Sequence, residues 1–334
     1  MEWTVRVAHS DISFPCRPEE SVLEAAQRAG LDIPYSCRRG VCITCQGRVV
    51  AGSVAEGGGV RSAAADGGPF QALFCSARPR SDITVSPRRV SRLPAAGRPR
   101  EVEARVFRKR EVAPGVVALH LRFPIGVRVA FRAGQSLELL LPGGLRRSYS
   151  MANPPAESDG VRLHVRVHPG GAFSGAALAG LEPGAPLRLA LPYGDVRLDG
   201  GDPRPLVLLA TGTGFAPVAS ILEEAVRRRW TRPIALYRGG RRPEDLYLPE
   251  LPARWARRLP DFRYEPVLSR PGGGWGGRPG RVQAAAAADL PDMSGVQVYA
   301  SGGPAMVAAA REGLTKLHGL PEGDFFADAF LPSA

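Results

Sequence analysis

The sequence predicts three domains that combine α+β and α/β structure: a compact cysteine-containing domain, an antiparallel barrel and a doubly wound parallel sheet. All five cysteines lie within the first 75 residues. Residues from about 101 to 200 form short alternating segments separated by Pro and Gly turns, which is typical of a small barrel. The last part alternates strands with helices, which indicates a parallel sheet. A chain of 334 residues is long enough for two or three such domains.

Composition excludes several classes of protein. With 44% hydrophobic and 23% charged residues, the chain is expected to fold into globular domains. No apolar run approaches the ~18 residues of a spanning helix, and the N-terminus MEWTVRVAHS lacks the features of a secretory signal. We therefore expect a cytoplasmic protein that does not span a membrane. The formal net charge of +12 would suit either nucleic acid or an acidic protein partner.

The first domain is predicted to span residues 1–92 and to hold a metal cluster. The capping-box pattern Ser21-Val22-Leu23-Glu24 predicts a helix that ends at Gly30. Four cysteines follow in the pattern C-x4-C-x2-C, then C after 29 further residues, and these are Cys37, Cys42, Cys45 and Cys75. This is the spacing of plant-type [2Fe–2S] ligands.

Two alternatives to the cluster remain, a zinc site and a set of unrelated buried thiols. Zinc sites usually pair two C-x2-C knuckles, and only one is present here. Cys16 lies outside the pattern and is expected to be a small buried apolar residue. The basic, proline-containing segment that follows predicts a linker over residues 93–100.

The second domain is predicted over residues 101–201. Its expected strands are Glu101–Phe107, Val116–Phe123, Ser136–Leu141, Val161–Val167 and Pro186–Leu191. The motif Arg147-Ser148-Tyr149-Ser150 is placed where one barrel strand ends. A guanidinium can pair with a pyrophosphate, a tyrosine can lie against a flavin ring, and a serine hydroxyl can reach a flavin nitrogen. Gly170 and Gly171, with Ser174 as the expected cap of a short helix, predict a diphosphate site.

The third domain is predicted over residues 202–334. Its expected strands are Pro205–Ala210, Ile234–Tyr237, Tyr264–Leu268 and Val296–Ala300, and its expected helices are Val218–Arg229 and Pro304–Leu317. The first turn contains Gly212, Thr213, Gly214, Ala216 and Pro217, a G-x-G-x-x-P variant of the dinucleotide fingerprint. Arg241 follows the second strand as a candidate contact for the adenosine end. Gly302 and Pro304 form a second turn, and both turns are expected to face one crevice.

Together these three motifs resemble the single-chain FAD/[2Fe–2S] NAD(P)H-dependent electron-transfer reductases. Members include benzoate dioxygenase reductase and CDP-6-deoxy-glucoseen reductase-like proteins. The segments Arg146–Asn153, Gly239–Pro243 and Phe325–Phe330 carry the likeness to the latter. The resemblance implies a β-grasp ferredoxin domain, an FAD-binding barrel and an NAD-binding domain like that of ferredoxin–NADP reductase. It also implies FAD, a [2Fe–2S] cluster and NADH, with NADPH as the alternative coenzyme.

The resemblance assigns catalytic roles to four residues, which are Ser150, Ser301, Asp328 and Phe330. Phe330 matches the C-terminal aromatic residue that lies over the flavin in relatives. Ser301 departs from the family, which usually has cysteine at the start of C-G-x-P. The resemblance therefore implies that hydride transfer survives here with an altered rate.

The resemblance implies that electrons pass from NAD(P)H through FAD and the cluster to a partner protein, with an oxygenase component as the expected acceptor. A CDP-deoxysugar dehydrase is the alternative partner, and a redox-sensing flavoprotein is the alternative from another class. We expect a monomer. The positive charge is then interpreted as neutralising bound cofactors and steering an acidic redox partner, with no role in nucleic-acid binding.

Overall fold

The computed structural model describes residues 2–93, 97–196, 198 and 200–330. The chain divides into two compact units, Met1–Arg98 and Pro99–Ala334. The first unit holds the predicted cysteine-containing domain, and the second holds both the barrel and the parallel sheet. Within the described residues, no helix is both long enough and apolar enough to cross a membrane. The exact domain boundaries at 92, 100 and 201 stay predictions, and part of the predicted linker (94–96) lies outside the described residues.

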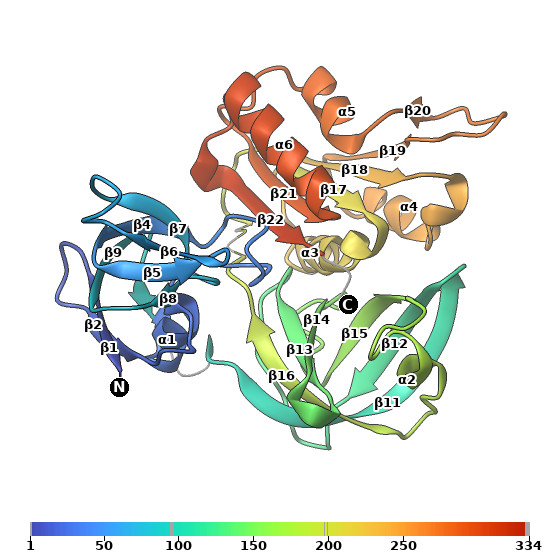
Figure 1. The fold of residues 1–334 in the computed structure, drawn as a ribbon. Coiled ribbons are helices and arrows are strands. Elements are labelled where there is room, and N and C mark those ends of the chain that lie inside the picture. Colours follow the sequence, from blue (N-terminus) through green and yellow to red (C-terminus); the bar gives the residue numbers. More distant parts are fainter. Residues whose placement is uncertain (1, 94–96, 197, 199, 331–334) are drawn as a thin grey trace. The chain divides into compact units, whose positions relative to one another are not determined.

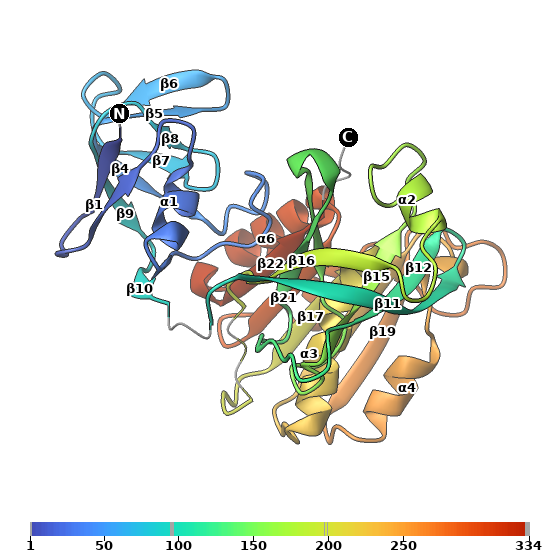
Figure 2. The ribbon, with the colours of Figure 1, turned by 90° about the horizontal axis from the view of Figure 1, so that it is seen from below.

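The first unit is built on a mixed five-stranded sheet in the order β2-β1-β9-β4-β7. These strands are β1 (Trp3–Val7), β2 (Ser13–Cys16), β4 (Gln46–Ala51), β7 (Phe70–Leu73) and β9 (Ile83–Pro87). Two smaller sheets pair β3 (Leu31–Asp32) with β10 (Ser91–Arg92), and β5 (Ser53–Glu56) with β6 (Gly59–Ser62) and β8 (Arg78–Pro79). One helix, α1 (Val22–Arg28), accompanies the main sheet (Figure 2). This arrangement is the predicted β-grasp ferredoxin fold.

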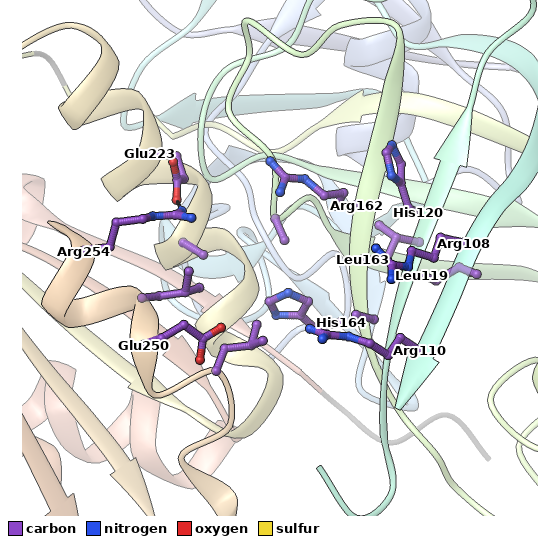
Figure 3. A pocket seen from close by; sticks show the side chains of 15 residues that line it. Arg108, Arg110, Leu119, His120, Arg162, Leu163, His164, Glu223, Glu250 and Arg254 are labelled. Atoms are coloured by element: carbon purple, nitrogen blue, oxygen red, sulfur yellow. Dashed lines mark hydrogen bonds and ion pairs between the residues drawn. The ribbon is translucent and has the colours of Figure 1, made fainter. Parts of the chain in front are cut away.

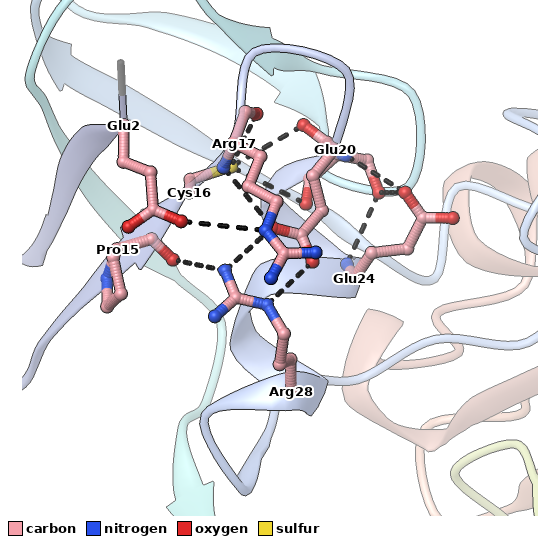
Figure 4. Close-up of polar contacts among 8 residues, drawn as sticks. Glu2, Pro15, Cys16, Arg17, Glu20, Glu24 and Arg28 are labelled. Carbon is pink, nitrogen blue, oxygen red and sulfur yellow. Dashed lines mark hydrogen bonds and ion pairs between the residues drawn. The ribbon is translucent and has the colours of Figure 1, made fainter.

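Helix α1 begins where the sequence predicts and ends at Arg28, two residues before the predicted Gly30. The Ser21 hydroxyl accepts the Glu24 backbone N–H, and the Glu24 carboxylate accepts the Ser21 N–H. Arg28 in the last turn forms an ion pair of 2.7 Å with Glu20 (Figure 4). Cys16, whose Sγ lies 3.4 Å from the Glu20 carbonyl oxygen just before α1, is fully buried, and burial raises the pKa of its thiol to about 12. Cys16 is therefore a small buried residue, as the sequence predicts.

The second unit begins with a six-stranded antiparallel sheet in the order β14-β13-β16-β11-β12-β15. The strands are β11 (Arg100–Ala113), β12 (Val116–Arg122), β13 (Ser136–Leu140), β14 (Arg146–Ser150), β15 (Gly160–Arg166) and β16 (Pro186–Tyr193). An isolated bridge between Met151 and Leu163 joins the two edges, which closes the predicted barrel around an apolar core. Strand β11 has 14 residues, twice the predicted length, because two irregularities in its pairing with β12 let it bend without ending.

The rest of the second unit is a parallel sheet in the order β20-β19-β18-β17-β21-β22. The strands are β17 (Leu206–Thr211), β18 (Ile234–Gly240), β19 (Phe262–Leu268), β20 (Arg278–Pro279), β21 (Gln297–Gly302) and β22 (Phe325–Ala329). Helices α3 (Phe215–Arg227) and α4 (Glu250–Ala256) cover one face, and α5 (Val282–Asp289) and α6 (Pro304–Leu317) cover the other (Figure 1). The sheet is therefore doubly wound, as predicted. After β17, the chain adds β18, β19 and β20 on one side of β17 and then β21 and β22 on its other side. The topological switch point therefore lies between β17 and β21.

The main differences from the predicted elements concern short or early helices. Helix α3 begins at Phe215 and not at Val218, because Gly212–Gly214 form a 3-10 turn (η3) that leads directly into it. Helices α4 and α5 have no counterpart in the predicted elements. The remaining short elements are α2 (Ala176–Ala179) and the 3-10 turns η2 (Pro142–Gly144), η4 (Pro243–Asp245) and η5 (Glu322–Asp324).

Candidate cofactor sites

The predicted cluster loop is held by backbone N–H groups that point at cysteine sulfur. Arg39 and Cys42 N–H donate to Cys37 Sγ at 3.5 and 3.3 Å, and Gly40 N–H donates to Cys75 Sγ at 3.2 Å. Gly40 has φ of 69°, in the left-handed region that glycine adopts without strain. Amides aimed at sulfur stabilise thiolates, which are the form that binds iron.

The four cysteines meet in two pairs, and this pattern fits a binuclear cluster. Hydrogen bonds join the thiols of Cys37 and Cys42, and those of Cys45 and Cys75. The bond from Cys42 lowers the pKa of Cys37, and the bond from Cys45 lowers the pKa of Cys75. In the part of the chain that the structure describes, no three His, Cys, Asp or Glu side chains converge as for a single metal ion. Two pairs of thiols supply two ligands to each iron of a [2Fe–2S] cluster, whereas a zinc ion would need all four around one point.

The predicted flavin motif is itself a barrel strand, β14, and does not merely follow the end of one. It pairs with β13 so that Ser150 lies opposite Ser136 and Arg147 opposite Leu139. Ser148 is exposed, whereas Ser150, two residues further on at the end of the strand, is buried. The Tyr149 ring is half-buried and packs edge-on against Phe173, with ring centroids 5.7 Å apart. Burial raises the pKa of the Tyr149 phenol to about 12, so this residue is a neutral aromatic surface at physiological pH.

The predicted diphosphate loop is present, but its capping role was predicted wrongly. The residue that caps α2 is Gly175, and Ser174 makes no capping hydrogen bond. Since α2 has only four residues, its dipole adds little to anion binding. The loop is nevertheless tightly closed, because a Cβ at Gly171 would lie 2.4 Å from Ser174 Oγ. Gly170 beside it has φ of 79° and faces open space, so these residues fit a loop that wraps a diphosphate.

A buried polar pair links the barrel to the parallel sheet. Ser150 Oγ donates a hydrogen bond of 2.6 Å to Asp328 Oδ2, and both residues are at least nine-tenths buried. Asp328 on β22 lies beside Ser301 on β21 in the parallel register, and Ser301 is fully buried. Phe330 N–H donates to Gly302 O at 2.8 Å. The structure thus brings together all four residues that were predicted to be catalytic.

The two predicted glycine-rich turns of the parallel sheet contact each other through their backbones. A Cβ at Gly214 would lie 2.2 Å from Ser301 O, and a Cβ at Gly302 would lie 2.0 Å from Thr211 Oγ1. Gly302 also has φ of 151°, and Gly212 has φ of 55°. Ala216 and Pro217 are buried in the first turn of α3, and Pro304 is the first residue of α6. Both turns lie at the carboxyl ends of β17 and β21, at the switch point where dinucleotides bind.

Gly214→Ala is expected to disrupt this turn. The new methyl group would overlap the Ser301 carbonyl, and backbone on both sides cannot move without separating β17 from β21. We expect KM for NADH to rise at least roughly tenfold, or folding to be lost, because such strain costs about 1–3 kcal/mol. Steady-state NADH oxidation and thermal unfolding measure both effects. Gly313→Ala is the matched control, since a Cβ there meets nothing within 4 Å; equal behaviour of the two variants would contradict the prediction.

Comparison with known proteins decides the family. The chain matches the 2Fe-2S iron-sulfur cluster binding domain over residues 5–80, the oxidoreductase FAD-binding domain over 103–198 and the oxidoreductase NAD-binding domain over 208–312. It is 40% identical to the terephthalate 1,2-dioxygenase reductase component 2 of a Comamonas species, over 99% of this chain and 98% of the relative. The chain belongs to the single-chain FAD/[2Fe–2S] NAD(P)H-dependent reductases.

Two further likenesses agree with this family. The CDP-6-deoxy-L-threo-D-glycero-4-hexulose-3-dehydrase reductase of Yersinia pseudotuberculosis is 33% identical over the full length of both chains. The crystal structure of the Amycolatopsis cytochrome P450 reductase GcoB superposes with a TM-score of 0.80 at 34% identity, over 99% of this chain and 100% of that one. The predicted family, fold class and cofactors are therefore confirmed, and the protein is an oxidoreductase that uses NAD(P)H, FAD and a [2Fe–2S] cluster.

Sequence reasoning missed several residues of this reductase that surround the first glycine-rich turn. His164 on β15 was not among the predicted site residues, and its Nδ1 lies 3.0 Å from the Tyr247 hydroxyl. Burial, followed by the charges of Arg238 and Arg162, lowers the pKa of His164 to about 3, so the ring is neutral. Arg166 also approaches the turn, since its Nη2 would lie 3.9 Å from a Cβ at Gly212. No local pattern marks these residues, because they come together only through packing of the barrel on the sheet.

A pocket of about 350 Å³ lies between the outer face of β11, β12 and β15 and the helices α3 and α4 (Figure 3). Arginines lie at its edge above apolar side chains such as Leu119 and Leu163. Two of these arginines already have partners, since Arg254 pairs with Glu223 and Arg162 with Glu157. None of the predicted cofactor residues lines this pocket, so it is separate from the candidate cofactor sites.

Proposed function

We propose that this reductase delivers electrons to the terminal component of a multicomponent oxygenase. The observation that carries the proposal is the 40% identity, over nearly the whole of both chains, to a reductase component of terephthalate 1,2-dioxygenase. A deoxysugar dehydrase is the second candidate acceptor, supported by the full-length match to a hexulose-dehydrase reductase at 33% identity. A redox sensor is disfavoured, because a sensor needs no complete route from NAD(P)H to a protein acceptor.

The residues of this chain have separate tasks in that route. When bound, FAD accepts a hydride and the cluster transfers single electrons, and the protein supplies orientation and electrostatics. Arg147, Ser148, Tyr149, Gly170, Gly171 and Ser174 are proposed to hold FAD. The turn of Gly212, Thr213 and Gly214, shaped by Ala216 and Pro217, is proposed to hold NADH together with Arg241, Gly302 and Pro304. Ser150, Ser301, Asp328 and Phe330 are proposed to face the reacting rings.

The test of the acceptor is direct electron transfer. The protein is reduced anaerobically with NADH and mixed in a stopped-flow instrument with candidate oxygenase components and candidate dehydrases encoded near its gene. We expect rapid loss of the reduced cluster signal with an oxygenase component, together with turnover of its substrate. Transfer to a dehydrase alone would favour the second candidate. If the protein fails to reduce cytochrome c with NADH, the redox-sensor hypothesis is favoured instead.

The reductase is predicted to prefer NADH to NADPH. The carboxylate of Asp245 accepts the backbone N–H groups of Arg241 and Arg242 at 2.8 and 3.3 Å, which fixes a negative charge at the proposed adenosine end. A 2′-phosphate would be repelled by that carboxylate. We expect kcat/KM for NADH to exceed that for NADPH by about tenfold or more. Asp245→Asn should lower the ratio of kcat/KM for NADH to kcat/KM for NADPH. A preference for NADPH in the unmodified protein would overturn the prediction.

Two further properties belong to the same proposal. We propose that the protein is a monomer and acts in the cytoplasm. Sedimentation velocity on the FAD-loaded protein tests the first property. Fractionation of cells that express the natural gene tests the second.

A further inference from the structure

Arg238 is a cation buried inside the NAD-binding part of the reductase. It lies on β18, is 1% exposed, and stands beside Ala210 of β17 in the parallel register. Its guanidinium stacks on the Phe215 ring at 3.6 Å and faces the Tyr247 ring at 4.8 Å. Its Nη2 donates a hydrogen bond to the Tyr247 carbonyl. These contacts hold the charge in an aromatic enclosure.

The charge of Arg238 has no anionic partner in this enclosure. Among the described residues, Arg238 forms no ion pair with a carboxylate within 4.0 Å. Its further polar neighbour is the phenol of Tyr264, whose pKa burial raises. Nη1 of Arg238 is otherwise buried without a hydrogen bond. Its neighbours are neutral, since the pKa of His164 is lowered to about 3 and burial raises the pKa of Tyr247 above its usual range. Glu250 acts on Arg238 only weakly, after Tyr247 and Tyr264. Burying a cation without a counterion lowers the stability of the folded protein, so we infer that the charge of Arg238 has a function.

The enclosure lies against the first glycine-rich turn. Phe215, which stacks on Arg238, is the first residue of α3 and follows Gly214 directly. The Tyr247 hydroxyl lies 3.5 Å from the Gly212 carbonyl oxygen. Arg238 is therefore one layer of side chains away from the backbone that is proposed to receive the coenzyme diphosphate.

A diphosphate at this turn would bring the negative charge that the enclosure lacks. Interactions between charges are stronger where water is excluded, so a buried guanidinium can act on an anion that it does not touch. Aromatic packing alone would not require the charge, because a methionine or glutamine of similar length could fill the same space.

We propose that Arg238 is a positioning residue for the coenzyme: an unpaired buried cation whose charge is balanced by the diphosphate bound at the Gly212–Gly214 turn. The inference rests on the proposed NADH site. It assigns the affinity for the diphosphate to a residue that lies outside that turn. Since β17 and β21 separate Arg238 on β18 from Asp328 on β22, the charge of Arg238 should affect coenzyme binding and leave the chemical step unchanged.

The test compares two competitive inhibitors of NADH oxidation, ADP-ribose with its diphosphate and adenosine without it. Arg238→Gln removes the charge and keeps a donor for the Tyr247 carbonyl. We expect KM for NADH and Ki for ADP-ribose to rise about tenfold, which corresponds to about 1.4 kcal/mol. Ki for adenosine and kcat at saturating NADH should change less than about twofold. Arg238→Lys, which retains the charge, should restore most of the ADP-ribose affinity.

Arg254→Gln is the matched control, because Arg254 is half-exposed and pairs with Glu223 on α3. FAD content and thermal unfolding check that each variant folds, and if Arg238→Gln does not fold, the comparison of Arg238→Lys with Arg238→Met replaces it. An equal loss for ADP-ribose and adenosine, or no change for either, would overturn the inference. If the unmodified protein shows no inhibition by ADP-ribose, the proposed NADH site itself is wrong.

Discussion

Cys75→Ala is expected to abolish electron transfer to protein acceptors while sparing the oxidation of NADH by ferricyanide. Cys75 shares its pair with Cys45 and accepts the Gly40 N–H at 3.2 Å, so its loss removes one of the two cysteine ligands of one iron. Substitution of a residue that hydrogen-bonds to a metal ligand typically lowers the affinity for the metal by roughly 10–100-fold, and removal of the ligand itself should lower it further. We therefore expect reduction of an oxygenase component or cytochrome c to fall at least ~100-fold.

The measurements for this variant are iron and sulfide content, visible absorbance and the rates with both acceptors. Cys16→Ala is the matched control, because Cys16 is the one cysteine outside the predicted ligand set and is fully buried beside α1. That control should keep the cluster and lose some stability, as expected for removal of a small buried group. A Cys75→Ala protein with a full cluster signal would disprove the ligand assignment.

Ser150→Ala is expected to slow the transfer of reducing equivalents from NADH to FAD by roughly 100-fold, the usual effect of removing one positioned polar group near a reacting centre. The Ser150 hydroxyl and the Asp328 carboxylate form a buried pair at 2.6 Å. Without the hydroxyl, the buried Asp328 side chain loses one hydrogen-bond donor, and the polar contact proposed at the flavin is lost. Anaerobic stopped-flow absorbance at saturating NADH measures this rate separately from coenzyme binding.

Ser220→Ala provides a control of similar burial and position. Ser220 Oγ donates a hydrogen bond of 2.6 Å to the Asn153 carbonyl, which also joins α3 to the barrel, yet Ser220 belongs to none of the proposed cofactor sites. Its loss should lower stability by about 1 kcal/mol and leave the hydride-transfer rate within about twofold. Equal effects of the two substitutions on the rate would show that Ser150 acts only by holding the barrel against the sheet.

Several elements were predictable because their signals are local. The capping box at Ser21 and Glu24 fixes the start of α1, and the apolar spacing after Pro304 predicts α6 with its observed bounds. Other elements were predicted wrongly, and each error has a physical reason. The length of β11 depends on bulges that the partner strand β12 allows, and the start of α3 depends on how η3 tightens the turn before it. The cap of α2 was assigned to Ser174, but the N-cap is Gly175, and the Ser174 hydroxyl occupies the space beside Gly171 in the loop.

The sequence by itself determined the chemistry of this reductase, because its cofactors are bound by short motifs whose residue types and spacing follow from ligand geometry. Four thiols at fixed intervals, an R-x-Y-S strand and two glycine-rich turns suffice to predict a cluster, a flavin and a nicotinamide coenzyme. Only the tertiary structure decided what surrounds these motifs. The pairing of Cys45 with Cys75, the bond between Ser150 and Asp328, and the stacking of Arg238 on Phe215 join residues far apart in the chain. Such contacts depend on how whole elements pack, and no local pattern encodes them.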